Sequence, residues 1–170
     1  MSKIKVFIPD YLAREYRKLL KLLRSAKGDV DFSKIRIAFT LANDACNCTN
    51  NYFSEPLIMQ ALQVAQIVAK DLPLGTEQVC TALMFKFVEN NLLDEKAIEA
   101  FLGKNIALQT KSLAEISKIN TQKISGQAEN FRKLLLTITD DVRIVLVKLA
   151  DRLYVMRTLD TEETEVQKRI

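Results

Sequence analysis

Histidine and tryptophan are absent from this sequence, and glycine (4) and proline (3) are scarce. Few glycines and prolines leave few places for tight turns, while Ala, Leu, Lys and Glu are common and favour helices. The composition therefore predicts helices joined by short connections and argues against a turn-rich β protein. With 170 residues, of which 48% are hydrophobic, the chain can form one domain with a sizeable core.

The charge pattern excludes some classes of partner. The 25 basic residues are interspersed with 21 acidic ones, for a net charge of +4, and no aromatic-basic stripe is present. We therefore expect no DNA partner. The N-terminal MSKIKVFIPD is too short and too basic for a secretion signal, and no run approaches the roughly 20 apolar residues of a membrane span. We expect no membrane association and a cytoplasmic location.

Three cysteines, Cys46, Cys48 and Cys80, are an odd number, which predicts reduced thiols. Cys46 and Cys48 form a C-x-C pair without a second pair or a histidine. This pattern does not predict a zinc site.

Hydrophobic periodicity predicts helices along most of the chain. We expect them at Tyr11–Ala26, from a cap at Asp31 or Ser33 through Ala45, and at Leu57–Ala69, Thr76–Glu89, Leu93–Phe101, Ile106–Ile119, Ala128–Thr137 and Asp140–Met156, with loops at Asn47–Ser54 and Thr121–Gln127. The last helix is apolar almost all round, which is typical of a central, buried helix. The fold class predicted is an all-α helical bundle with no sheet of more than two short strands.

Residues 127–159, QAENFRKLLLTITDDVRIVLVKLADRLYVMRTL, closely resemble the stretch that closes the hydrolase domain of RelA/SpoT homologues. SEPLIMQALQVAQIVA (54–69) is similar to that family's Gly-Glu-Pro-Tyr-Ile-x-His-Pro segment, and TALMFKFVEN (81–90) to its Ala-Ala-Leu-Leu-His-Asp-Val-Val-Glu-Asp segment. The order and spacing agree over about residues 30 to 160. The resemblance implies an HD-type helical fold whose active members use a divalent cation, usually manganese, to remove the 3′-pyrophosphate of ppGpp.

HD chemistry needs imidazoles and carboxylates that converge on a cation, which then acidifies a water for attack on phosphorus. By the resemblance, the first metal-binding histidine falls on Gln60 and the His-Asp pair on Phe85 and Lys86. The final aspartate is kept as Asp151. The resemblance thus implies that one of four metal ligands remains, and we expect no metal cofactor.

Other family positions have changed as well. The carboxylate pair that helps to orient the attacking water is half kept, as Glu89 with Asn90. An Arg-Lys dipeptide that faces the nucleotide falls on Asn51 and Tyr52, and the His-Asn after Asp-Arg-Leu becomes Tyr154 and Val155. Arg157 and Thr158 are retained as a nucleotide-binding remnant.

These changes lead to the hypothesis of a degenerate HD-type ppGpp hydrolase-like domain over residues 1–160, followed at 161–170 by the start of a linker toward a synthetase domain. We expect the domain to be inactive as an enzyme and to serve as a regulatory or structural module in guanosine tetraphosphate metabolism, within the stringent response. Its partner would be the adjacent synthetase domain of a longer chain that acts as a GTP pyrophosphokinase. Neither the activity of that synthetase, the regulatory signal nor the oligomeric state follows from the sequence.

Two alternatives remain. The pocket could be a metal-independent guanine-nucleotide sensor that uses Arg157, Thr158 and Glu89, or a 3′-pyrophosphohydrolase with a rearranged site. For each changed position a packing role competes with a functional one: Phe85 as core filling, and Glu89 as a solvated helix residue. We further predict that Lys86 lies within about 4 Å of Asp151 or Glu89, as an ammonium group in place of the lost metal ion.

Overall fold

Seven helices and no strand make up the part of the chain that the computed structural model describes: residues 9–26, 29–48, 54–72, 74–117 and 141–158, without the side chains of 47–48 and 54–56. The helices are α1 (Asp10–Ser25), α2 (Phe32–Cys48), α3 (Ser54–Asp71), α4 (Thr76–Glu89), α5 (Glu95–Leu102), α6 (Lys104–Ser117) and α8 (Val142–Thr158). The predicted all-α class is confirmed. None of the described helices combines the length and apolarity that a membrane span needs.

Local capping chemistry sets several helix ends. The Asp31 carboxylate accepts hydrogen bonds from the backbone amides of Ser33 (3.0 Å) and Lys34 (3.1 Å), which fixes the start of α2. The Asp94 carboxylate caps α5 in the same way through the amide of Ala97 at 2.8 Å. Gly103 follows α5 at φ 93°, a backbone conformation that residues with a side chain rarely adopt.

The predicted loop over Asn47–Ser54 is too long at both ends. Helix α2 continues through Asn47 to Cys48, and α3 already begins at Ser54. Ala42 and Ala45 are buried in the turns just before Asn47, so the tertiary packing of α2 outweighs the weak helix propensity of this asparagine. The predicted loop at 121–127 and helix at 128–137 lie outside the described residues.

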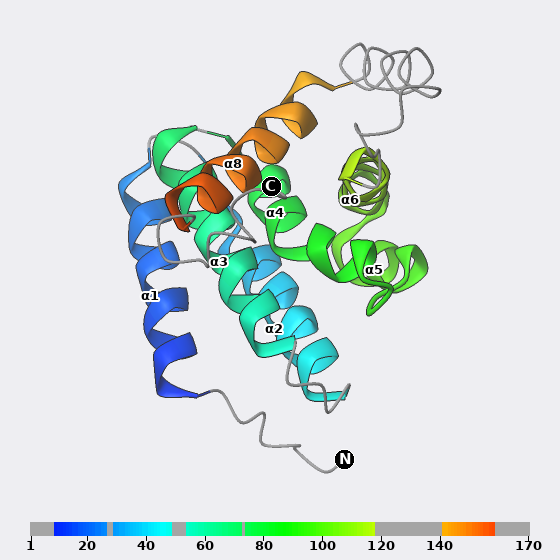
Figure 1. Cartoon of the computed structure of the whole chain (residues 1–170), viewed down its shortest axis with the longest axis horizontal. Helices are drawn as coiled ribbons and strands as arrows, with labels where there is room; N and C mark the ends of the chain where they lie inside the picture. Colours follow the sequence, from blue (N-terminus) through cyan, green and yellow to red (C-terminus); the bar gives the residue numbers. More distant parts are fainter. Residues whose placement is uncertain (1–8, 27–28, 49–53, 73, 118–140, 159–170) are drawn as a thin grey trace, which may run out of the picture.

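Helix α4 is the centre of the described bundle (Figure 1). It packs against α2, α3, α6 and α8, while α1 lies on the far side of α3 and α5 packs on α6. Nine of its residues are buried: Gln78, Val79, Cys80, Thr81, Ala82, Leu83, Met84, Phe85 and Phe87. Contacts on several sides explain why α4 carries almost no polar face.

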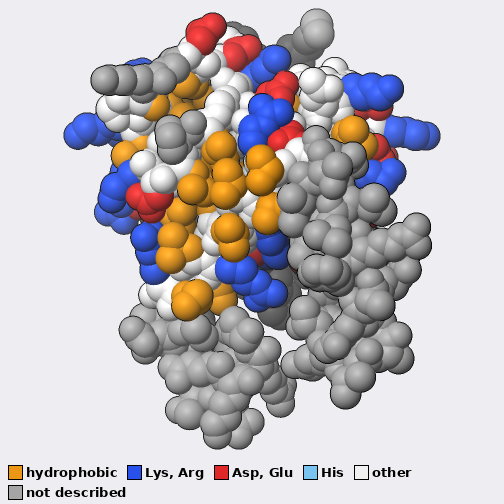
Figure 2. All heavy atoms as spheres, turned by 90° about the horizontal axis from the view of Figure 1, so that it is seen from above, with side chains coloured by type: hydrophobic (Ala, Val, Ile, Leu, Met, Phe, Trp, Pro, Cys, Tyr) orange, Lys and Arg blue, Asp and Glu red, His pale blue; other side chains and the backbone are white. Residues whose placement is uncertain are grey.

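Helix α8 is not the central helix that its apolar pattern predicted. Leu149 is 57% exposed, and Val142 and Met156 are exposed as well. Its buried residues lie on one face, which packs against α3, α4 and α6: Ile144, Val147, Ala150 and Asp151. Figure 2 shows apolar side chains gathered on the upper face of the molecule, the end that α8 crosses in Figure 1. Apolar residues on every side of α8 therefore did not predict that every side of this helix is buried.

A buried carboxylate joins α1 to α3. Glu15 is 5% exposed, and its side chain accepts hydrogen bonds from Gln63 (3.1 Å) and Gln66 (3.2 Å) of α3. Lys18 pairs with the same carboxylate at 2.6 Å. Burial raises the pKa of Glu15, but hydrogen bonds from Lys18 and Gln66 outweigh it, so the pKa lies below its ordinary value. The Glu15 carboxylate therefore stays ionised at neutral pH in the contact between α1 and α3.

Candidate functional site

Asp151 is the buried acid of the candidate site. It lies on the inner face of α8, and 2% of its surface is exposed. One carboxylate oxygen, Oδ1, accepts a hydrogen bond from Gln60 Nε2 of α3 at 3.2 Å and faces Lys86 Nζ of α4 at 3.4 Å. The other oxygen, Oδ2, accepts from Lys148 Nζ at 3.0 Å. Side chains from α3, α4 and α8 therefore converge on this one carboxylate.

Lys86 occupies the position predicted for a replacement cation. Its Nζ lies 3.1 Å from Glu89 Oε2 and 3.4 Å from Asp151 Oδ1, and 13% of its side chain is exposed. The ammonium group also lies 5.1 Å from the centre of the Phe85 ring, within cation–π range. The prediction that Lys86 lies within about 4 Å of Asp151 or Glu89 is confirmed, and both carboxylates lie within that distance. Phe85 itself is fully buried, as expected of a core residue.

A second lysine was missed by the sequence analysis. Lys148 Nζ bridges Asp151 Oδ2 (3.0 Å) and Ser117 Oγ of α6 (2.7 Å). Its side chain is 15% exposed and lies three residues before Asp151 on α8. Residues three apart on a helix are neighbours, so this spacing could have suggested the contact. The role of Ser117 depends on how α6 packs against α8 and had no signal in the sequence.

Together, Lys86, Glu89, Lys148 and Asp151 form a charge cluster with two cations and two anions. The opposite charges offset the cost of burial, since an unpaired charge at this depth would be expensive. Such a donor set does not fit a divalent cation, because ammonium groups repel it and both oxygens of Asp151 already have lysine partners. Within the described residues, no group of three or more His, Cys, Asp or Glu side chains could hold a metal ion.

The remaining predicted residues do not join the charge cluster. Asn90 is exposed, and its side-chain amide donates to the Lys86 carbonyl at 2.8 Å, at the end of α4. Arg157 pairs with Asp71 at 3.5 Å, at the end of α3. The Thr158 hydroxyl donates to the backbone carbonyl of Tyr154 at 3.2 Å, within α8. The structure thus groups the predicted metal positions but separates Arg157 and Thr158 from them.

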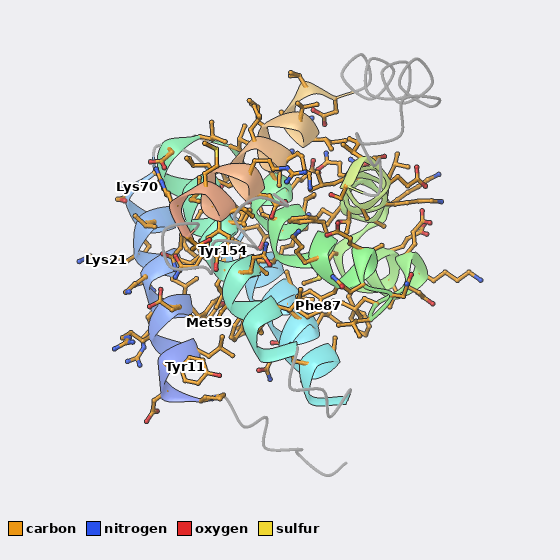
Figure 3. The ribbon with its side chains drawn as sticks, in the orientation of Figure 1. Tyr11, Lys21, Met59, Lys70, Phe87 and Tyr154 are labelled. Carbon is orange, nitrogen blue, oxygen red and sulfur yellow. The ribbon has the colours of Figure 1, made fainter. Side chains whose placement is uncertain are left out.

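Of the two substituted nucleotide positions on α8, Tyr154 is half-buried and packs against the core (Figure 3). Val155 is likewise half-buried. Asn51 and Tyr52 lie outside the described residues.

The described helices and the charge cluster together define the class of this protein: an all-helical domain with a buried charge cluster where α3, α4 and α8 meet.

Comparison with known proteins identifies the family. A model described as an HD domain matches residues 38–170, so the chain belongs to the HD-domain family. Its sequence is 30% identical over 156 residues to the bifunctional (p)ppGpp synthase/hydrolase SpoT of Escherichia coli K12, covering 91% of this chain and 22% of that protein. It is 32% identical over 160 residues to the GTP pyrophosphokinase rsh of Brucella ovis, covering 94% of this chain and 21% of the relative.

These matches confirm the resemblance to the hydrolase region of RelA/SpoT-type proteins. The chain spans about a fifth of the length of the curated relatives it matches.

The expectation that the domain is not an enzyme is contradicted. A relative from Escherichia coli O157:H7, 30% identical over 91% of this chain, is named guanosine-3′,5′-bis(diphosphate) 3′-pyrophosphohydrolase, which is an enzyme. The relative from Shigella flexneri has the same name and is likewise 30% identical to this chain over 156 residues. The prediction equated the loss of metal ligands with the loss of all activity. Substitutions at the metal-ligand positions are evidence about metal binding, and they do not exclude enzymatic activity of the domain.

Proposed function

We propose that this chain is the hydrolase-type module of a longer protein of (p)ppGpp metabolism, and that it regulates that protein through a site in which a lysine has replaced the metal ion. The observation that carries the proposal is the position of Lys86, 3.4 Å from Asp151 and 3.1 Å from Glu89. The names of the relatives and the fifth of their length that the chain spans support the wider context.

The argument for regulation starts from how the charge cluster is assembled. Asp151 on α8 is tied to α3 by Gln60, to α4 by Lys86 and, through Lys148 and Ser117, to α6. Four helices are thus linked through one carboxylate. A change in this cluster alters how α8 sits on the bundle, and α8 leads directly into the residues that follow the domain.

The experiment compares (p)ppGpp synthesis from ATP and GTP by the longer protein with synthesis by the same protein lacking residues 1–160. A second pair compares the intact longer protein with its Lys86→Met variant. A change of at least about fivefold in both comparisons, a coupling of roughly 1 kcal/mol, supports regulation through the cluster. Equal rates in both comparisons contradict it, as does a coding sequence that ends with this domain.

A second candidate is a 3′-pyrophosphohydrolase with a rearranged site, and the names of the relatives from Escherichia coli O157:H7 and Shigella flexneri favour it. Its test is the release of GDP and pyrophosphate from ppGpp by the 170-residue chain, with manganese and with a chelator in parallel. Release that Asp151→Asn abolishes supports a rearranged site. No release above the buffer control under either condition refutes this candidate and leaves the regulatory proposal to its own test.

A further inference from the structure

The outer face of α1 carries a row of cations. Five exposed basic side chains recur at spacings of three and four along this helix: Arg14, Arg17, Lys18, Lys21 and Arg24. Such spacings place them on one side of the helix, opposite its buried apolar side. Figure 3 shows Lys21 pointing away from the bundle. We call these five residues the basic face.

Most of the positive charge on the basic face is uncompensated. The buried Glu15 carboxylate pairs with Lys18 at 2.6 Å and lies 3.9 Å from Arg14. Among the described residues, no carboxylate pairs with the other three cations of the face, Arg17, Lys21 and Arg24. The face is therefore free to bind an anionic partner from outside the bundle.

The exposed surface of α1 limits what that partner can be. Its exposed residues include no apolar side chain: Asp10, Arg14, Arg17, Lys18, Lys21, Arg24 and Ser25. A membrane surface or an apolar protein interface would thus find nothing to bury on α1. An acidic peptide would gain little, since an exposed ion pair contributes only about 0–1 kcal/mol. A polynucleotide gains more, because neutralising its phosphates releases condensed counterions.

The spacing of the cations matches a single polynucleotide strand. Arg14 and Arg24 are ten residues apart, or about 15 Å along the helix, so the five cations lie about 3 Å apart on average. One stacked strand carries a phosphate about every 3.4 Å, and a duplex carries twice that charge. A groove of about 830 Å³ runs along the face, lined by Asp10, Tyr11, Arg14, Arg17, Lys18 and Lys21.

Two residues of this groove favour RNA as the strand. Tyr11 is half-buried and lines the groove beside the cations, so its ring offers a surface on which a base can stack. Asp10 places an exposed carboxylate, which only accepts hydrogen bonds, in the same groove. The ribose 2′-hydroxyl of RNA can donate to it, whereas DNA has no such donor.

We infer that the basic face of α1 binds a single strand of RNA, with the cations on its phosphates. The face spans about four or five nucleotides. Binding is independent of base sequence, because phosphate and ribose are common to every nucleotide. The inference does not rest on the proposed function, since the charge cluster lies on α4 and α8 and the basic face on α1.

The test measures binding of a fluorescein-labelled oligouridylate of about 12 nucleotides to the 170-residue chain by fluorescence anisotropy. If the four cations that line the groove bind phosphates, the slope of log K against log [NaCl] is about −2.8. The affinity should then fall about 50-fold between about 50 and 200 mM NaCl. No binding at the lower salt concentration would overturn the inference.

Two variants of equal net charge locate the site. Arg17→Gln/Lys21→Gln removes two of the four contacts and should weaken binding, with the affinity falling only about sevenfold over the same range of salt. The control, Lys96→Gln/Lys104→Gln, removes the same charge from exposed positions of α5 and α6 and should bind as the wild type does. Equal losses in the two variants would assign binding to net charge and overturn the inference. Far-ultraviolet circular dichroism checks that both variants are folded.

Competitors identify the chemistry of the partner. Unlabelled oligouridylate should displace the probe at lower concentrations than oligodeoxyuridylate of the same length, and Asp10→Ala should remove this preference. An oligoglutamate of equal charge should compete poorly. Competition by oligoglutamate as strong as by oligouridylate would replace RNA with an acidic protein partner. Equal displacement by the RNA and DNA strands in the wild-type chain would contradict the assignment to RNA.

Discussion

Removing Asp151 should destabilise the domain more than removing Lys86, because the two truncations leave different charges stranded. Asp151→Ala leaves the ammonium groups of Lys86 and Lys148, whose side chains are 13% and 15% exposed, with Glu89 as the one remaining carboxylate of the cluster, 3.1 Å from Lys86. Breaking a buried pair in this way costs about 3–5 kcal/mol. Lys86→Ala leaves Asp151 with Lys148 at 3.0 Å and Gln60 at 3.2 Å, so its cost should be about 1.5–3 kcal/mol, the value of one charged hydrogen bond.

Lys86→Met should lower the unfolding free energy by about 1 kcal/mol less than Lys86→Ala, because methionine keeps an apolar chain in place of the largely buried lysine stem, whose side chain is 13% exposed. The measurement is urea unfolding at pH 7 followed by far-ultraviolet circular dichroism. The control is Lys96→Met on the exposed side of α5, which should stay within about 0.5 kcal/mol of wild type. If Asp151→Ala proves no more costly than Lys86→Ala, Asp151 is not the common partner of both lysines.

Three further predictions concern other parts of the molecule. The pKa of Glu15 lies below its ordinary value, so the ionised carboxylate stabilises the fold above about pH 4.5, and this stabilisation is lost as the pH falls below that. Between about pH 6 and pH 3, Glu15→Gln should therefore lose less unfolding free energy than the wild type. An equal loss in the two proteins would refute the assignment. Burial raises the pKa of Cys80 to about 12, so peptide mapping after iodoacetamide at pH 8 should find it alkylated only in urea, and alkylation of the folded chain would contradict this. Gly103→Ala should cost about 1–2 kcal/mol in thermal unfolding through backbone strain alone, while Gly75→Ala, at φ −74° with an ordinary 3.7 Å contact, should be close to neutral.

The sequence determined the helices of this protein and much of its site. Periodicity and capping signals are local, so the cap predicted at Asp31 is found at the start of α2 in the structure. The aligned motifs also carried enough spacing to bring Lys86 and Asp151 together across 65 residues. Those two residues could be paired in advance because the resemblance supplied a fold in which both positions face one point.

Packing decided the rest. An apolar sequence shows that a helix can be buried on any side, but only the neighbouring helices decide which side is covered. Leu149 is therefore exposed on α8, while α4 takes the centre. The partnership of Lys148 with Ser117, and the burial of Glu15 beneath two glutamines of α3, likewise join helices distant in sequence. Such contacts depend on how helices are placed relative to one another, and that placement arises only when the whole chain packs.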